Sequence, residues 1–199
     1  MEKQSQQNEP AQNVQPKNKQ FCIGILVSET NLESIRHYNE QFRLINKRYK
    51  NRVKLLFFGY NPEKDPFKSL EGVDYDYVKN VSIIHQPKQF NACEINLLFV
   101  PLVKNGMNAS SEDIDEFLFA GIFKIPILVC DIYPFNKVVQ NDVNGFIYKD
   151  REAFYPYLED LLRTRIPVIE LAGKSAYIDV TSKFNFSDNN LNKQLNVFC

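Results

Sequence analysis

The chain contains no tryptophan, only two histidines, and no excess of charge of either sign. Its 24 basic and 24 acidic residues cancel, so composition offers no electrostatic argument for binding nucleic acid or an anionic membrane. No apolar run approaches the ~20 residues that a transmembrane helix needs. The first twenty residues lack the apolar core of a secretory signal. We therefore predict no nucleic-acid partner and no membrane span.

Several motifs that mark enzyme classes are also missing. The sequence has no nucleophile elbow, no Walker loop and no Ser/His/Asp arrangement. His37 is expected on the polar side of a helix and His85 at the end of an apolar run. Neither has a cysteine or carboxylate at metal-ligand spacing, so we predict no metal site and no cofactor.

The four cysteines are scattered, without the paired spacing of metal or redox sites. Three of them, Cys22, Cys93 and Cys130, lie in or beside apolar runs, where free thiols act as small hydrophobes. This pattern favours a reducing, cytoplasmic location.

The chain has 199 residues, of which 44% are hydrophobic, a size and composition that fit one domain with a substantial core. Residues 1–20 are mostly Gln, Asn, Lys and Pro, and we predict a disordered polar leader there. Residues 21–199 are then a single folded domain.

Apolar runs and helical patterns alternate along this domain. Continuous apolar runs predict strands covered on both faces, at residues 21–27, 52–60, 94–102 and 127–130. A short strand is expected at 81–85 and a last strand after Asn144-Gly145, which would supply left-handed turn positions. The order strand, helix, strand implies right-handed parallel crossovers. We predict an α/β, Rossmann-like domain with a mostly parallel sheet, helices on both faces and a helical C-terminus.

Two helices border the loops where such a fold binds ligands, beyond the carboxyl ends of its strands. Between the first two strands, apolar residues spaced three and four apart predict one amphipathic helix over residues 31–49, capped by Ser28 or Thr30. After the 94–102 strand, a helix is expected over about 112–123.

The order of these segments resembles the C-terminal, nucleotide-sugar-binding half of glycosyltransferases with the GT-B architecture. The resemblance covers roughly residues 21–198 and rests on an ordered series of segments. Its clearest members are "IGILVSETNLESI", "INLLFVPLVKNGMN" and "EFLFAGIFKIPILVCDIYPFNKVVQNDVNGF". It implies a Rossmann-like domain that binds a nucleotide-sugar donor, with no further cofactor.

The resemblance also implies a set of donor-binding residues, although it assigns no catalytic residue. Backbone N–H groups of the loop after the 94–102 strand would cradle the diphosphate, and an acid on the next helix would hold the ribose. The candidates are Ser28, Gly106, Asn108, Ser110, Ser111 and Glu116. Each has a structural alternative as a loop residue, a helix cap or an exposed helical carboxylate. Asp131, at the end of the 127–130 strand, is either a ligand-edge acid or a turn residue.

The donor motif departs from the family pattern. Counting back from Pro126, the family's glutamate position falls on Phe119, its lysine position on Glu116 and its glycine position on Lys124. A diphosphate needs cations or helix N–H groups. Here the first helical turn carries acids, which suit the helix dipole but repel phosphate, against a helix-end charge of only about +0.5.

Length is the second departure, because the acceptor-binding half of a GT-B enzyme has no counterpart in the sequence. We therefore expect either a glycosyltransferase-like donor domain that works with a separate partner, or a non-catalytic scaffold with a degenerate glycosyltransferase fold. A small-molecule-binding α/β domain of another lineage is a third alternative.

Overall fold

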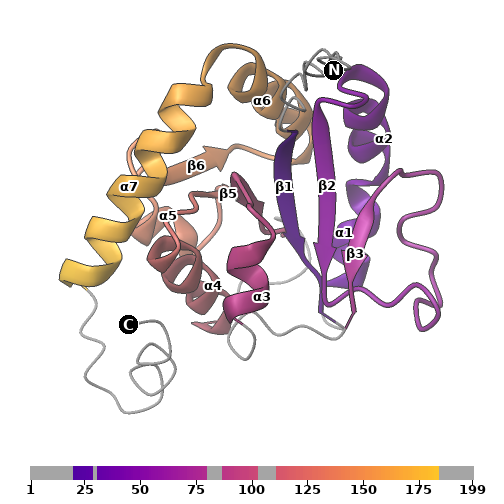
Figure 1. The fold of residues 1–199 in the computed structure, drawn as a ribbon, viewed down its shortest axis with the longest axis horizontal. Coiled ribbons are helices and arrows are strands. Elements are labelled where there is room, and N and C mark those ends of the chain that lie inside the picture. The colour runs from indigo at the N-terminus through magenta and orange to yellow at the C-terminus, as the bar shows by residue number, and fades with distance from the viewer. Residues whose placement is uncertain (1–19, 29–30, 80–86, 103–110, 184–199) are drawn as a thin grey trace, which may run out of the picture.

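A single sheet of six parallel strands forms the centre of the protein (Figure 1). The computed structural model describes residues 20–28, 31–79, 87–102 and 111–183. The strand order is β3-β2-β1-β4-β5-β6. The strands are β1 (Phe21–Leu26), β2 (Val53–Phe58), β3 (Asp76–Val78), β4 (Leu97–Phe99), β5 (Ile127–Cys130) and β6 (Gly145–Tyr148). The predicted α/β, Rossmann-like class with a parallel sheet is confirmed.

Seven helices are described, and they cover both faces of the sheet, as predicted (Figure 1). They are α1 (Leu32–His37), α2 (Asn39–Arg48), α3 (Pro87–Ala92), α4 (Ser111–Ile122), α5 (Phe135–Val138), α6 (Arg151–Thr164) and α7 (Ile166–Lys183). The last two confirm the helical C-terminal part as far as Lys183. The polar leader lies outside the described residues except for Gln20, so its disorder stays a prediction.

An aromatic cluster fills the core on the face that α2 and α6 cover. Its six rings come from both helices, the α1–α2 junction and three strands, with neighbouring centroids 4.5–6.5 Å apart. The members are Tyr38, Phe42, Phe57, Phe99, Tyr148 and Phe154. Every one is at most 1% exposed, so the cluster joins strands from both halves of the sheet to the same pair of helices.

A smaller aromatic group holds α3 and α4 on the opposite face. Phe90 of α3 lies 5.3 Å from the ring of Phe58 on β2 and 5.5 Å from that of Phe119 on α4. Phe123, just after α4, packs on Phe119 at 4.9 Å. Successive strand residues Phe57 and Phe58 therefore pack on opposite faces of the sheet, which explains why β2 is apolar and buried from Leu55 to Phe58.

The edge strand β3 is not among the strands predicted from the sequence. Asp76 and Tyr77 are exposed, so the segment lacks the apolar run that marks the central strands. It pairs with β2 over the register Leu56–Asp76 to Phe58–Val78. The strand predicted at 81–85 lies outside the described residues.

The helix predicted over residues 31–49 is wrong in one respect, because it is two helices. Tyr38 ends α1 and precedes α2 with φ −101° and ψ 3°, outside the helical range of ψ. Its fully buried side chain takes part in the aromatic cluster. The residue at the break thus belongs to the core.

The turn before β6 also differs from the prediction. The left-handed residue is Asp142, with φ 65°, whereas Asn144 and Gly145 do not have positive φ. Asn144 is instead buried, and its amide accepts from Gln140 N at 2.7 Å and donates to Asp179 Oδ2 at 2.7 Å. Asn144 therefore ties this turn to α7.

Candidate functional site at the carboxyl edge of the sheet

The strand order has a switch point between β1 and β4, and the carboxyl edge at this point is the candidate crevice. From β1 the chain runs outward through β2 to β3, and from β4 it runs outward in the other direction through β5 to β6. These two central strands pair in parallel from Ile23–Leu97 to Ile25–Phe99. The helices that follow them cover opposite faces, so their connections diverge. Open α/β sheets bind ligands at this switch point, beyond the carboxyl ends of the strands.

Ser28 lies at the β1 side of the crevice, with an exposed side chain. Its backbone N–H donates to Asn31 Oδ1 at 2.9 Å, while Asn31 Nδ2 donates to the Leu26 carbonyl at 3.0 Å. The N-cap of α1 is Asn31, and its side chain makes no capping bond to the helix. The expected capping by Ser28 is therefore wrong, and Thr30 lies outside the described residues. The sequence analysis did not identify Asn31 as the N-cap. The only signal for this role was its position just before the helical pattern.

Two buried tyrosines hold the β4 side of the crevice. Tyr38 Oη lies 2.6 Å from the Leu102 carbonyl and 2.7 Å from Tyr148 Oη. Because a carbonyl only accepts, Tyr38 donates to Leu102 and Tyr148 donates to Tyr38. Burial raises the pKa of both phenols above the ordinary value, so both hydroxyls keep their protons at neutral pH. The hydrogen bond from Tyr38 thus holds Leu102, which follows β4, against the core.

The loop candidates fall between β4 and α4. Gly106, Asn108 and Ser110 lie outside the described residues, and Ser111 begins α4 with a side chain that also falls outside them. In the sequence, these residues stand between Leu102, which follows β4, and the start of α4. Donor binding by these four residues stays a prediction.

Helix α4 presents different chemistry at the two positions that the family pattern singles out. Glu116 is partly buried on α4. Phe119, at the position of the family's glutamate, is 4% exposed and packs between Phe90 and Phe123. Phe119 has no carboxylate that could bind a ribose, and its ring is part of the core.

The end of α4 explains the third departure from the family pattern. Lys124 has φ 59°, the left-handed conformation that glycine adopts at low cost. Its N–H donates to the Gly121 carbonyl at 2.9 Å, and Ile125 N–H donates to the Ala120 carbonyl at 3.0 Å. This pair of bonds is a Schellman motif with Lys124 at its C′ position. The position therefore keeps the backbone geometry of a glycine although a lysine occupies it.

Asp131 follows β5 at the same edge and organises a turn. Its carboxylate accepts from Asn136 Nδ2 at 3.2 Å, and its N–H donates to the Tyr148 carbonyl at 2.8 Å. The peptide bond Tyr133–Pro134 in this turn is cis, and the Tyr133 side chain is 69% exposed. These bonds agree with the turn interpretation of Asp131.

Within the described part of the chain, no group of three or more His, Cys, Asp and Glu side chains could hold a metal ion. His37 is exposed, as expected, and His85 falls outside the described ranges. None of the described helices is both long and apolar enough to cross a membrane.

The sequence matches no protein-family model and no curated protein. Several solved structures do match. The C-terminal domain of LpcC, a glycosyl transferase group 1 family protein from Francisella tularensis, superposes with a TM-score of 0.61 and 14% identity over 83% of this chain and 87% of that domain. HepE from Anabaena, solved in complex with UDP-glucose, superposes with a TM-score of 0.64 and 13% identity over 89% of this chain and 48% of HepE.

WaaG, a glycosyltransferase involved in lipopolysaccharide biosynthesis, gives a TM-score of 0.62 and 14% identity over 91% of this chain and 48% of WaaG. The chain thus spans less than half the length of HepE and of WaaG. Identities this low establish a shared fold. The protein therefore has the fold of the C-terminal domains of GT-B glycosyltransferases.

Proposed function

We propose that the protein binds a nucleotide-sugar donor and acts as the donor half of a glycosyltransferase. The observation that carries this proposal is the switch point between β1 and β4 in a domain with the GT-B fold. HepE, which shares that fold, was solved with UDP-glucose. The reaction would be transfer of the sugar from its nucleotide to an acceptor.

The proposed donor lies across the carboxyl edge, with its diphosphate at the start of α4. This helix has twelve residues, so its first N–H groups and its dipole attract phosphate. Gly106, Asn108, Ser110 and Ser111 would contribute N–H groups from the loop and the first turn. Ser28 faces the same crevice from β1, and Glu116 is the carboxylate proposed for the ribose.

An acceptor-binding partner is part of the proposal, because the chain spans under half of HepE and of WaaG. The open carboxyl edge would then be closed by that partner, either as a separate polypeptide or within a larger assembly. We propose a cytoplasmic location, since no disulfide joins Cys22, Cys93 and Cys130, the cysteines within the described ranges.

A non-catalytic scaffold is the second candidate, and Phe119 favours it. The ring sits in the core at the position where the family carries a ribose-binding glutamate. Asp115, exposed on α4, adds negative charge near the proposed phosphates. In this alternative the domain keeps its fold to bind a protein partner and no longer binds a nucleotide.

Thermal denaturation with UDP-, GDP- and ADP-sugars separates the two candidates. A ligand present at 100 times its Kd should stabilise the protein by about 2.7 kcal/mol, which raises the Tm by several degrees. A shift with one nucleotide-sugar supports the donor domain. No shift with any of the three at millimolar concentration supports the scaffold.

Charge reversal at Asp115 tests the position of the donor and leaves the proposed ribose carboxylate in place. Asp115→Lys replaces an exposed acid of α4 with a cation beside the proposed diphosphate, and we expect nucleotide affinity to rise about tenfold. Glu170→Lys makes the same change of charge at an exposed position of α7 and serves as the control. Equal affinity changes in both variants would place the diphosphate elsewhere.

A further inference from the structure

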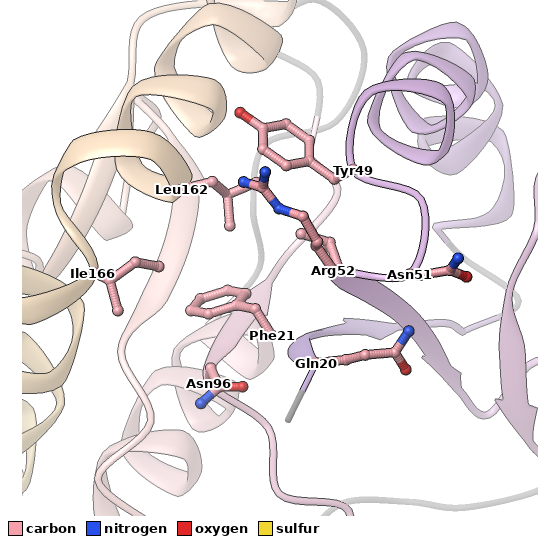
Figure 2. A pocket seen from close by; sticks show the side chains of 9 residues that line it. Gln20, Phe21, Tyr49, Asn51, Arg52, Asn96, Leu162 and Ile166 are labelled. Atoms are coloured by element: carbon pink, nitrogen blue, oxygen red, sulfur yellow. The ribbon is translucent and has the colours of Figure 1, made fainter. Parts of the chain in front are cut away.

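A hollow of about 490 Å³ lies at the amino edge of the sheet, opposite the proposed donor crevice. It is bordered by the start of β1, the α2–β2 turn and the α6–α7 corner (Figure 2). Its volume falls within the range of roughly 300–1,000 Å³ that small-molecule sites occupy. The six residues of β1 separate it from the carboxyl edge by roughly 16 Å, so one small ligand cannot occupy both sites.

The walls of this amino-edge hollow combine a ring with aliphatic side chains. Phe21 opens β1 and is only partly buried, and its ring lies in the middle of the hollow (Figure 2). Leu162 of α6 and Ile166 of α7 approach it from the side (Figure 2). A flat, weakly polar ring would stack on these surfaces and remove them from water.

Amide side chains supply hydrogen-bonding groups at the rim. Asn96 Oδ1 accepts a hydrogen bond from Cys22 N at 2.8 Å, which orients the amide group. Its Nδ2 can then donate to a ligand. Asn51 and Gln20 add two further amides. Amides of this kind both donate and accept, so they suit the polar edge of a ring.

Arg52 is the charged residue in the lining of the hollow, and it would favour a negatively charged ligand. Its guanidinium lies 5.4 Å from the centroid of the Tyr49 ring, a cation–π arrangement, and points into the space between Tyr49 and Phe21 (Figure 2). Neighbouring cations are neutralised: Arg48 pairs with Glu159 at 3.4 Å, and Lys54 pairs with Asp76 at 2.7 Å.

For Arg52, by contrast, the described residues contain no carboxylate within salt-bridge distance, and no carboxylate belongs to the lining of the hollow. An arginine that packs on an aromatic ring and forms no ion pair can use its N–H donors to bind a phosphate or carboxylate. The lining therefore favours an anionic ligand over a neutral or cationic one.

We infer that the amino-edge hollow binds a small organic anion: a flat ring that carries one phosphate or carboxylate group. The anion contacts Arg52, the ring stacks on Phe21, and the polar edge of the ring meets the amides of Asn51 and Asn96. This site is separate from the donor crevice and does not depend on the proposed glycosyltransferase activity.

The test is an NMR titration of the ¹⁵N-labelled protein, which reports where each probe binds. The probes are UMP, phenyl phosphate, benzoate and inorganic phosphate. We expect saturable shifts at the amides of Phe21, Arg52 and Asn96 with UMP and phenyl phosphate, at concentrations at least tenfold below those needed for inorganic phosphate. Benzoate distinguishes a carboxylate ligand from a phosphate ligand. Shifts confined to residues such as Ser28 and Leu102 would mean donor-crevice binding only and would overturn the inference.

Variants of matched charge identify the recognising group. Arg52→Gln should weaken binding of phenyl phosphate about tenfold or more, because it removes a charge-assisted hydrogen bond. Lys47→Gln removes one exposed positive charge from α2, outside the hollow, and should change the affinity less than about twofold. Phe21→Leu keeps an apolar side chain but removes the ring, and should weaken phenyl phosphate more than inorganic phosphate. Equal losses in the Arg52 and Lys47 variants would show general charge attraction and refute the site.

Discussion

Removing the hydroxyl of Tyr38 should destabilise the protein more than removing the hydroxyl of Tyr148. The Tyr38 hydroxyl donates to the Leu102 carbonyl at 2.6 Å and accepts from Tyr148 at 2.7 Å. Tyr38→Phe therefore leaves two buried polar groups without a partner. Tyr148→Phe removes one hydrogen bond but leaves Tyr38 bonded to Leu102.

The magnitudes follow from these partners. A buried polar group that loses its hydrogen bond costs about 1–3 kcal/mol, whereas a typical hydrogen bond contributes a net ~1 kcal/mol. We expect Tyr38→Phe to lower the free energy of unfolding by about 3 kcal/mol and Tyr148→Phe by about 1 kcal/mol. In the double variant the Tyr148 hydroxyl is absent and needs no partner. The double loss should therefore be smaller than the sum of the single losses by about 1 kcal/mol.

Urea denaturation followed by circular dichroism measures these free energies, because the chain has no tryptophan to report by fluorescence. Tyr133→Phe, at a side chain that is 69% exposed, is the control and should stay within about 0.5 kcal/mol of the parent. The reasoning is refuted if Tyr148→Phe costs as much as Tyr38→Phe, or if the two losses are additive.

Three further changes test other parts of the structure. Gly173→Ala should destabilise the protein by about 2 kcal/mol or more despite the better helix propensity of alanine, since the new Cβ would overlap the Lys124 carbonyl oxygen; a gain in Tm would contradict this. Lys124→Gly should raise the free energy of unfolding by about 0.5–1 kcal/mol, because it relieves the left-handed conformation. Burial would raise the pKa of Asp65, but N–H groups of Ser69 and Phe67 outweigh it and hold the pKa below 3.8. Stability from this group is present above pH 3.8 and is lost as the pH falls through the lower folded-state pKa, so Asp65→Asn should flatten the stability curve in that range.

The central strands could be predicted from the sequence because their signal is local. In β1 and β5 nearly every side chain is buried, so each reads as a continuous apolar run. The edge strand β3 could not be recognised in this way, because Asp76 and Tyr77 face solvent and only backbone pairing with β2 makes it a strand. The break at Tyr38 was also hidden, since its spacing fits an unbroken helical stripe.

The site could be located but not described at the level of atoms. Alternation of strands and helices implies a parallel sheet, and the order of the strands then places a crevice beyond β1 and β4. The hydrogen bond from Tyr38 to Leu102 joins residues 64 positions apart, so no local pattern could reveal it. The amino-edge hollow was missed for the same reason, because Phe21, Arg52 and Ile166 meet only through the tertiary fold.

The two properties that matter for a donor site depend on different residues. The position of the crevice follows from strand order and from buried groups such as Tyr38, whose loss would destabilise the whole domain. In the proposed donor site, phosphate affinity would depend instead on the first turns of α4, where exposed acids such as Asp115 can change with little effect on stability. A chain can therefore keep the GT-B fold while its affinity for nucleotides rises or falls. It follows that Asp115→Lys and Tyr38→Phe should change different properties. The first should raise nucleotide affinity at nearly constant Tm, and the second should lower the Tm because it removes the hydrogen bond to the Leu102 carbonyl.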